Sequence, residues 1–352
     1  MILAALVFCA AAIPGLAETL RIATYHTELS RKGPGLLLRD ILRGEDAQVE
    51  AVAQVVGAVS PDILILQGVD YDRDLLALAA LRDVIAKTGP HYPHLFALRP
   101  NTGLASGLDV DGDGKLGEPE DAQGYGWFAG EGGMAILSRH PLATDAVQDF
   151  SAMLWADLPG AIPPPGMAEE LRAGLRLSTT GHWVVPVRME SGLLHLLTFH
   201  AGPPVFDGPE DRNGRRNHDE IVFWRQYLNG AFGPASKARF VLAGDANLDP
   251  VDSEGRKVAI RALLEDKRLQ DPAPRRSGPA PEDDVQRGDP ALDTAAWSGP
   301  KPGHLRVSYI LPSADLTVTR SGVFWPPEGA PLAEVAARAS RHRMVWVDLA
   351  IE

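Results

Sequence analysis

Short apolar runs, separated by polar or glycine-containing turns, recur along the whole chain. They occupy residues 20–25, 62–66, 132–137, 183–188, 193–199, 240–243, 305–311 and 345–349. Apolar stretches of about 4–8 residues with such boundaries are typical of strands buried in a sheet. A turn at residues 190–192 is expected to join the fourth and fifth runs into a strand pair. The pattern therefore predicts a chain rich in buried strands.

Apolar positions at helical spacing predict helices between several of these strands. The clearest is the segment that Asp46 can cap at its N-terminus and that Ser60-Pro61 closes. We expect helices at residues 46–59, 74–87, 218–228 and 254–265, and a loop that enters a helical stretch at 33–43. Glycine, proline and charged residues predict loops at 100–132, 158–166, 208–217 and 271–290. Helices alternate with strands early and strands dominate later, which predicts an α/β fold of two packed sheets with outer helices.

Composition narrows the class of protein. The chain has 352 residues, of which 45% are hydrophobic and 23% are charged, as in soluble globular proteins. This length suits one large domain or two modest ones. The formal net charge of −12 disfavours tight binding of duplex nucleic acid, since few counterions would be released. A nuclease that bridges to phosphate through a divalent cation is still compatible with this charge.

The first 17 residues are apolar and end in small residues, as secretory signal peptides do. They lack the usual positive start, so the alternative of a buried first strand or helix stays open. A membrane anchor is disfavoured because the segment is short. The only cysteine, Cys9, lies in this segment, so a mature chain would contain no disulfide. We predict an exported, periplasmic or extracellular, soluble protein with its folded domain at 18–352.

Polar side chains with catalytic potential fall at the ends of the predicted strands. The clearest case is the turn after residues 240–243, where Asp245 and Asn247 stand two residues apart. A carboxylate and a neutral amide in one pocket suit chemistry on water near a cation. A turn that merely bonds its own backbone is the alternative for this pair. The full set of strand-end candidates is His26, Gln67, His200, Asp245, Asn247, Ser308 and His342.

A second metal signal lies in the predicted loop at 100–132. The segment starting at Asp109 matches the D-x-D-x-D-G-x₅-E calcium loop, with Gly114 in register for the sharp turn. The expected ligands are Asp109, Asp111, Asp113, Lys115 through its backbone carbonyl, and Glu120. Pro119 is unusual because a helix normally follows there, so we expect an isolated structural Ca²⁺ site. The alternative is an acidic surface loop without an ion.

Seven segments, taken in order, resemble the endonuclease/exonuclease/phosphatase superfamily. They are RIATYHTEL (21–29), PDILILQGVD (61–70), GGMAILSRHPL (132–142), LLTFHAG (196–202), FVLAGDANLDP (240–250), LRVSYIL (305–311) and SRHRMVWVDL (340–349). The resemblance implies a DNase-I-like four-layer α/β sandwich and a metal-assisted attack of water on a phosphate ester. It also implies that Asp245 and Asn247 position the water, while His200 and His342 contact the phosphate.

The chain departs from the family pattern at several of these positions. The family has an Asn where this chain has His26, and its L-Q-E motif reads Leu66-Gln67-Gly68 here. It also has an Asp where this chain has Ser308, and often another where it has Arg341. Hard divalent ions depend on carboxylates. Gln67 would therefore need help from Glu28, Asp70 or Asp249 to hold Mg²⁺ or Mn²⁺.

Two functions are compatible with these observations. The first is an exported, divalent-metal-dependent phosphoesterase or nuclease-like hydrolase that acts as a monomer on small phosphomonoesters or phosphodiesters. Its expected cation ligands are Gln67, Glu28 and Asp249, and its expected substrate and supporting residues are His26, Ser308, Tyr309 and Arg216. Arg216 belongs to a basic cluster at 212–218 that either grips phosphate or merely solvates a loop. The second function is a catalytically degenerate, calcium-stabilised binding or scaffold protein of the same fold.

Overall fold

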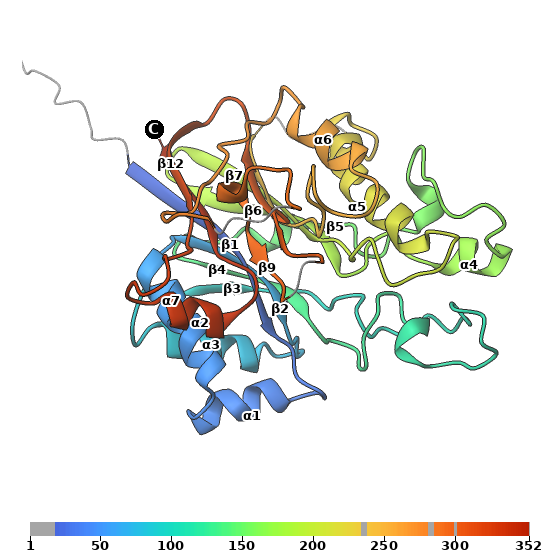
Figure 1. Cartoon of the computed structure of the whole chain (residues 1–352), viewed down its shortest axis with the longest axis horizontal. Coiled ribbons are helices and arrows are strands. Elements are labelled where there is room, and N and C mark those ends of the chain that lie inside the picture. The colour runs from blue at the N-terminus through green and yellow to red at the C-terminus, as the bar shows by residue number, and fades with distance from the viewer. Residues whose placement is uncertain (1–17, 234–237, 281–284, 299–300, 352) are drawn as a thin grey trace, which may run out of the picture.

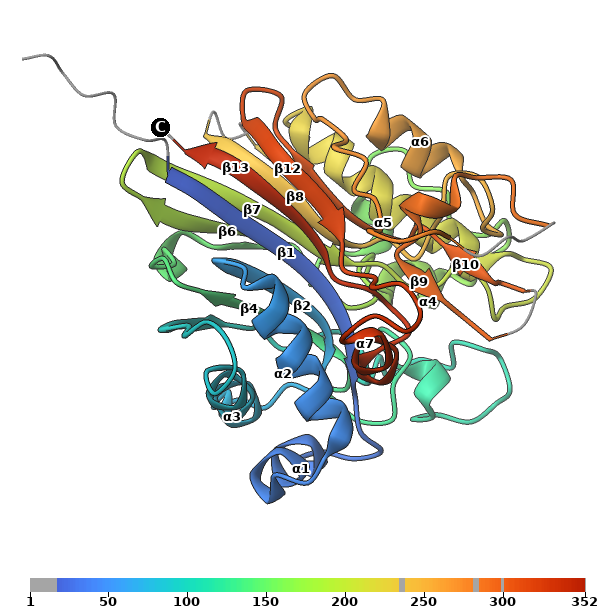
Figure 2. The ribbon, with the colours of Figure 1, turned by 60° about the vertical axis from the view of Figure 1, so that its left-hand side comes forward.

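Two β-sheets pack face to face, and helices cover the outer face of each (Figures 1 and 2). The structure is a computed structural model that describes residues 18–233, 238–280, 285–298 and 301–351. The predicted signal peptide at 1–17 lies outside the described residues. The arrangement confirms the predicted four-layer α/β sandwich.

The first sheet has six strands in the order β12-β13-β1-β2-β4-β3. Its strands are β1 (Glu18–Leu29), β2 (Ile63–Val69), β3 (His94–Phe96), β4 (Gly133–Ser138), β12 (Thr317–Val323) and β13 (Val345–Ile351). β1 and β2 run parallel, while the other neighbours pair antiparallel.

The second sheet has five strands in the order β11-β8-β7-β6-β5. Its strands are β5 (Gln148–Asp149), β6 (Gly181–Met189), β7 (Gly192–His200), β8 (Arg239–Asp245) and β11 (Ser308–Pro312). β7 and β8 run parallel, so their C-terminal ends lie side by side. A small separate ladder joins β9 (Ala295–Ala296) to β10 (His304–Leu305).

Seven α-helices and four short 3₁₀ helices complete the described residues. The α-helices are α1 (Leu36–Arg43), α2 (Ala47–Val59), α3 (Leu76–Ile85), α4 (Glu169–Gly174), α5 (Arg212–Leu228), α6 (Val258–Leu264) and α7 (Ala333–Ala339). The 3₁₀ helices are η1 (Pro119–Asp121), η2 (Thr144–Ala146), η3 (Trp155–Asp157) and η4 (Pro290–Leu292). None of the helices in the described part of the chain is long and apolar enough to cross a membrane.

Three apolar clusters hold the layers together. One lies between the first sheet and helices α1, α2, α3 and α7, and a second lies between the two sheets. The third lies between the second sheet and helices α5 and α6. Burial of these side chains removes apolar surface from water, which is the main favourable contribution to folding. The strand ends with polar residues are thereby held at fixed positions at one end of the sandwich.

Several element boundaries differ from the sequence prediction. Helix α2 is confirmed, because Asp46 accepts hydrogen bonds from the backbone N–H groups of Gln48 and Val49. Helix α5, however, starts at Arg212 rather than at residue 218, inside a segment predicted to be a loop. Its first turns carry few apolar residues, and Asn217 there donates to the carbonyls of Gly202 and Ala246, both at 2.8 Å. This tertiary pairing favours the helix without leaving an apolar pattern.

Candidate active site

The strand register brings the predicted polar residues together. In the second sheet, Asp245 at the end of β8 pairs with His200 of β7 on one side and with Ser308 of β11 on the other. In the first sheet, His26 of β1 pairs with Gln67 of β2. Because the two sheets pack face to face, their strand ends meet around Asp245.

Three imidazoles surround the buried carboxylate of Asp245. His26 Nδ1 lies 2.7 Å from Asp245 Oδ2, and His342 Nδ1 lies 3.4 Å from the same oxygen. The other oxygen, Oδ1, accepts the backbone N–H of Asn247 at 2.9 Å. The His26 ring centre lies 4.7 Å from that of His200 and 4.1 Å from that of His342. Asp245 is fully buried, so these contacts form in a place shielded from water.

Burial and charge set the protonation of this histidine–aspartate cluster (His26, His200, Asp245 and His342). Burial opposes ionisation of Asp245, but His342 and a hydrogen bond from His26 hold the pKa of this carboxyl well below its usual range. Burial, and then the neighbouring His26, lower the pKa of His200 and of His342 to about 3. At neutral pH, an ionised carboxylate therefore lies beside two neutral imidazoles, which can accept a proton or bind a cation.

Asn247 lies at the edge of this cluster in a left-handed backbone conformation, with φ of 49°. Asn adopts this conformation more readily than most residues. Its side-chain amide donates to the Ala201 carbonyl at 2.8 Å and lies 3.4 Å from His200 Nε2. The amide is thus anchored beside His200, in reach of the same space.

Gly68 leaves the space that the His26 ring occupies in the cluster. Its φ is +68°, and a Cβ atom there would lie 2.6 Å from His26 Cδ2 and 2.7 Å from His26 Nε2. The His26 ring therefore occupies the space in which a side chain at position 68 would begin. Gln67 faces Thr24 instead, with its Nε2 2.9 Å from the Thr24 hydroxyl. Positions 26 and 68 both differ from the family pattern, and the glycine at 68 is what makes room for the histidine at 26.

Glu28, an expected cation ligand, accepts hydrogen bonds from Ser340 and Arg341. Its Oε2 accepts the Ser340 hydroxyl at 3.0 Å and the Arg341 N–H at 2.7 Å, while Oε1 accepts Arg341 Nε at 2.7 Å. Burial opposes ionisation of Glu28, but the bonds from Arg341 prevail and lower its pKa to about 2. The ion pair with Arg341 was not expected from the sequence, because the two residues are far apart in the chain.

Three other expected site residues serve structural contacts. Asp249 Oδ1 accepts the N–H groups of residues 251 and 252, and its Oδ2 accepts the Arg306 N–H at 2.8 Å. The Tyr309 hydroxyl lies 2.8 Å from the Leu248 carbonyl and 2.7 Å from that of Arg306. Arg216 donates to backbone carbonyls, among them Leu177 at 2.9 Å. The sequence prediction gave Tyr309 and Arg216 as substrate contacts and Asp249 as a cation ligand, whereas the structure shows their polar atoms bonded to the backbone.

Ser308 has a different environment. It is 1% exposed, and its hydroxyl has no hydrogen-bond partner among the described residues. His342 Nδ1 is likewise buried without a hydrogen-bond partner in the described part of the chain. An aspartate at 308, as in the family pattern, would offer a negative charge that serine does not. Asp245 is the carboxylate that the structure places beside His342 instead.

The acidic loop (residues 109–121) forms a second group of carboxylates. Ligand atoms of Asp109, Asp111 and Asp121 lie within 4.8 Å of one another. The sequence prediction chose Glu120 as the last ligand, but Glu120 is exposed and Asp121 points inward from η1. Asp113 binds the Lys115 ammonium at 2.6 Å instead of joining the group. The backbone turn at η1 places Asp121, and not Glu120, beside Asp109 and Asp111. The twelve-residue spacing of the motif carries no information about this turn.

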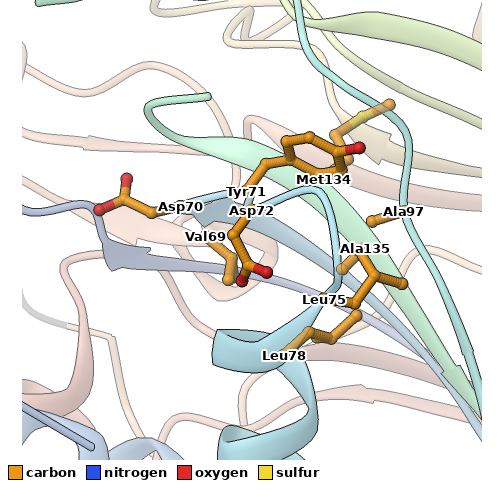
Figure 3. A pocket seen from close by; sticks show the side chains of 9 residues that line it. All are labelled: Val69, Asp70, Tyr71, Asp72, Leu75, Leu78, Ala97, Met134 and Ala135. Carbon is orange, nitrogen blue, oxygen red and sulfur yellow. The ribbon is translucent and has the colours of Figure 1, made fainter. Parts of the chain in front are cut away.

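A small crevice lies beside Asp70, at the end of β2 (Figure 3). Its volume of about 10 Å³ has room for about one water molecule. Figure 3 shows the Asp70 carboxylate directed away from Leu75 and Leu78. Its oxygens accept the backbone N–H groups of Arg31 at 2.8 Å and Gly132 at 3.0 Å. Burial, despite these bonds, raises the pKa of Asp70 to about 6. Asp70 therefore fastens the end of the 100–132 segment.

Comparisons with known proteins agree with this architecture. The sequence profile of the Endonuclease/Exonuclease/phosphatase family matches residues 39–342. A search of curated proteins finds no significant match.

Similar solved structures include three bacterial proteins of that description. The protein from Beutenbergia cavernae has 19% identity and a TM-score of 0.54, covering 95% of this chain and 72% of its own. The protein from Leptotrichia buccalis has 15% identity and a TM-score of 0.51, and the match covers 94% of this chain and 99% of that one. The protein from Bacteroides vulgatus has 13% identity and a TM-score of 0.51, and the match covers 95% of this chain and 100% of that one. At these identities the likeness shows the fold alone.

Proposed function

The chain belongs to the Endonuclease/Exonuclease/phosphatase family of phosphoesterase- and nuclease-type hydrolases, and we propose that it hydrolyses phosphate esters at the histidine–aspartate cluster. The observation that carries this proposal is the buried Asp245, with three imidazoles around it at the strand ends. Acid–base groups gathered in one buried place are typical of an active site.

The residues of the cluster have distinct roles in this proposal. Asp245 holds His26 in a fixed orientation through the 2.7 Å contact to Nδ1. His200 and His342 are neutral because burial lowers the pKa of both, so His342 can accept a proton from an attacking water. The Asn247 amide, anchored on Ala201, orients water or a phosphate oxygen beside His200. These roles extend the sequence prediction, in which the two histidines only contacted phosphate.

Family members generally use divalent metals, but the donor set here does not suit Mg²⁺. Magnesium prefers oxygen ligands, chiefly carboxylates and water. Glu28, Gln67 and Asp249 all bind other protein groups, and the cluster contains one carboxylate among three imidazoles. We therefore assign no catalytic step to Mg²⁺.

The substrates we propose are small phosphomonoesters or phosphodiesters. The support is the net charge of −12, which weakens the attraction of a long polyanion such as duplex DNA. Arg216, the expected phosphate contact, donates to backbone carbonyls instead. We also propose that the chain is exported by residues 1–17 and acts as a monomer.

We propose a weak structural Ca²⁺ site at the acidic loop, with Asp121 in place of Glu120. Its support is the grouping of Asp109, Asp111 and Asp121 and the oxygen ligands that Ca²⁺ prefers. The carboxylate of Asp109 already accepts the N–H groups of Gly112 and Gly114, at 2.8 and 2.9 Å, which shapes the loop around it.

Hydrolysis of bis-p-nitrophenyl phosphate and p-nitrophenyl phosphate tests the function. We expect turnover with the purified chain, loss of turnover in Asp245→Asn, and retention in Asp145→Asn, whose side chain is on the surface. The relative rates distinguish diester from monoester preference. No turnover with any divalent metal, in a folded protein that Ca²⁺ stabilises against heat, would instead favour the calcium-stabilised binding or scaffold protein.

A further inference from the structure

We infer that the histidine–aspartate cluster binds a transition-metal ion of the zinc class, with His26, His200 and Asp245 as ligands and a fourth position beside His342 open to water. One ligand atom from each of the first three lies within 4.8 Å of the others. This inference deepens the proposed function by naming the metal of the same site, although metal binding itself does not depend on turnover.

The distances suit a small, four-coordinate ion. Zn–N and Zn–O bonds of about 2.0–2.1 Å in a tetrahedron separate neighbouring ligand atoms by roughly 3.3 Å. His342 Nδ1 already lies 3.4 Å from Asp245 Oδ2, and His26 Nδ1 lies 2.7 Å from it. The ligand atoms of His26, His200 and Asp245 lie within 4.8 Å of one another, so a contraction of at most about 1.5 Å would bring them to tetrahedral spacing.

His342 provides an independent indication of a missing partner. The residue is 3% exposed, and its Nδ1 has no hydrogen-bond partner among the described residues. A buried polar nitrogen without a partner is costly, so native proteins normally satisfy it. A water molecule bound to an ion on His26, His200 and Asp245 would be the partner that this nitrogen lacks.

The chemistry of the donors selects the class of ion. Imidazole nitrogen suits Zn²⁺, Co²⁺, Ni²⁺ or Cu²⁺, whereas Mg²⁺ and Ca²⁺ prefer oxygen. The side chains that could have made the site oxygen-rich are absent or occupied. Position 68 is a glycine whose Cβ space the His26 ring fills, and Glu28 is held by Arg341.

Cobalt binding tests the inference with a readout that does not depend on turnover. Co²⁺ added to the metal-stripped chain is expected to give the intense visible absorption of a four-coordinate site, at about one equivalent, and Zn²⁺ to abolish it. A large excess of Mg²⁺ is expected to leave the band unchanged. Octahedral oxygen sites absorb weakly, so the acidic loop does not imitate this signal.

Variants locate the bound ion. Loss of a supporting group around a metal typically lowers affinity 10–100-fold, so loss of a direct ligand should lower it at least about 100-fold. We expect this result for His26→Asn and for His200→Asn. His195→Asn serves as the matched control, since His195 lies on the same strand β7 but five positions before His200. Circular dichroism and thermal melting of each variant establish that the chain is folded.

Each outcome has one meaning. An absent four-coordinate band, or a band that survives His26→Asn in a folded protein, would overturn the inference. Turnover with Mg²⁺ after removal of all transition metals would do the same while leaving the proposed hydrolysis intact. A four-coordinate band without hydrolysis of either ester would support the metal site and reject the proposed function.

Discussion

The two groups of candidate metal ligands are built in opposite ways. The histidine–aspartate cluster takes its members from β1, β7, β8 and the segment before β13, so the sheets fix its geometry. The acidic loop takes all its members from residues 109–121, where short turns closed by Asp109 and Asp111 arrange the backbone. Asp245 is fully buried, whereas Asp111 is exposed.

This difference predicts different responses to change. A buried site on paired strands is rigid, so replacing one member damages its chemistry while the fold persists. An exposed loop gains order from its ion, so the same replacement chiefly alters stability. Cluster variants should therefore affect catalysis and loop variants the response to Ca²⁺.

The largest effect is expected from Asp245→Asn. The change removes the only carboxylate in the cluster while keeping its shape, and we expect kcat/KM for the favoured nitrophenyl ester to fall about 10³-fold. Steady-state kinetics of the variant and of Asp145→Asn measure the difference. A loss below about 10-fold would mean that Asp245 does not act in the chemistry.

Gly68→Ala tests the steric coupling to His26. The methyl group would meet the imidazole at 2.6 Å in a backbone of positive φ, so we expect a loss of about 2 kcal/mol in the free energy of unfolding, with weaker metal binding. Gly35→Ala is the matched control, because Gly35 also has a positive φ of +75° but open space around it. Urea denaturation compares the two variants. Equal destabilisation would show that the His26 contact is unimportant.

The acidic loop allows a test with two adjacent residues. Ca²⁺ is expected to raise the Tm of the unmodified chain by about 2–4 °C, and Asp121→Asn should abolish this rise. Glu120→Gln should leave the rise intact, because Glu120 is exposed and outside the group of carboxylates. Calorimetry with Ca²⁺ or with a chelator measures both. If Glu120→Gln abolished the rise in Tm and Asp121→Asn did not, Glu120 would be the ligand, as the spacing of the motif predicts.

The smallest effect concerns Asp70, which fastens the loop segment to the first sheet. Its pKa is raised from 3.8 to about 6, so the native state binds more protons than the unfolded state between these values. Stability from this carboxyl is therefore greatest below pH 4 and falls as the pH rises through 6, by about 1 kcal/mol after allowance for solvent screening. Asp70→Asn should remove this decline in urea denaturation across pH 4–7. If the stability of Asp70→Asn still declined with pH as in the unmodified chain, Asp70 would not be the source of the decline.

Much of the fold was predictable because its signals are local. The buried strands, helix α2 with its Asp46 cap, and the turn that carries Asp245 all follow from patterns within a few residues. Strands β3 and β12 and helix α7 were not predicted. β12 is largely exposed and lies at the edge of its sheet, so it lacks the apolar run that marks a central strand. Helix α7 is short, and its buried residues Ala336 and Ala339 give only a weak apolar signal.

The sequence alone determined which polar residues follow strands, because the end of an apolar run is written in neighbouring positions. Only the tertiary structure decided which of them meet. His26 reaches Asp245 across 219 positions, Arg341 captures Glu28 across 313, and Arg216 turns to backbone carbonyls. Such contacts depend on how two sheets pack and on the space that Gly68 leaves, and no local pattern records these distances. Strand ends are thus a property of the sequence, whereas the ligand set is a property of the packing.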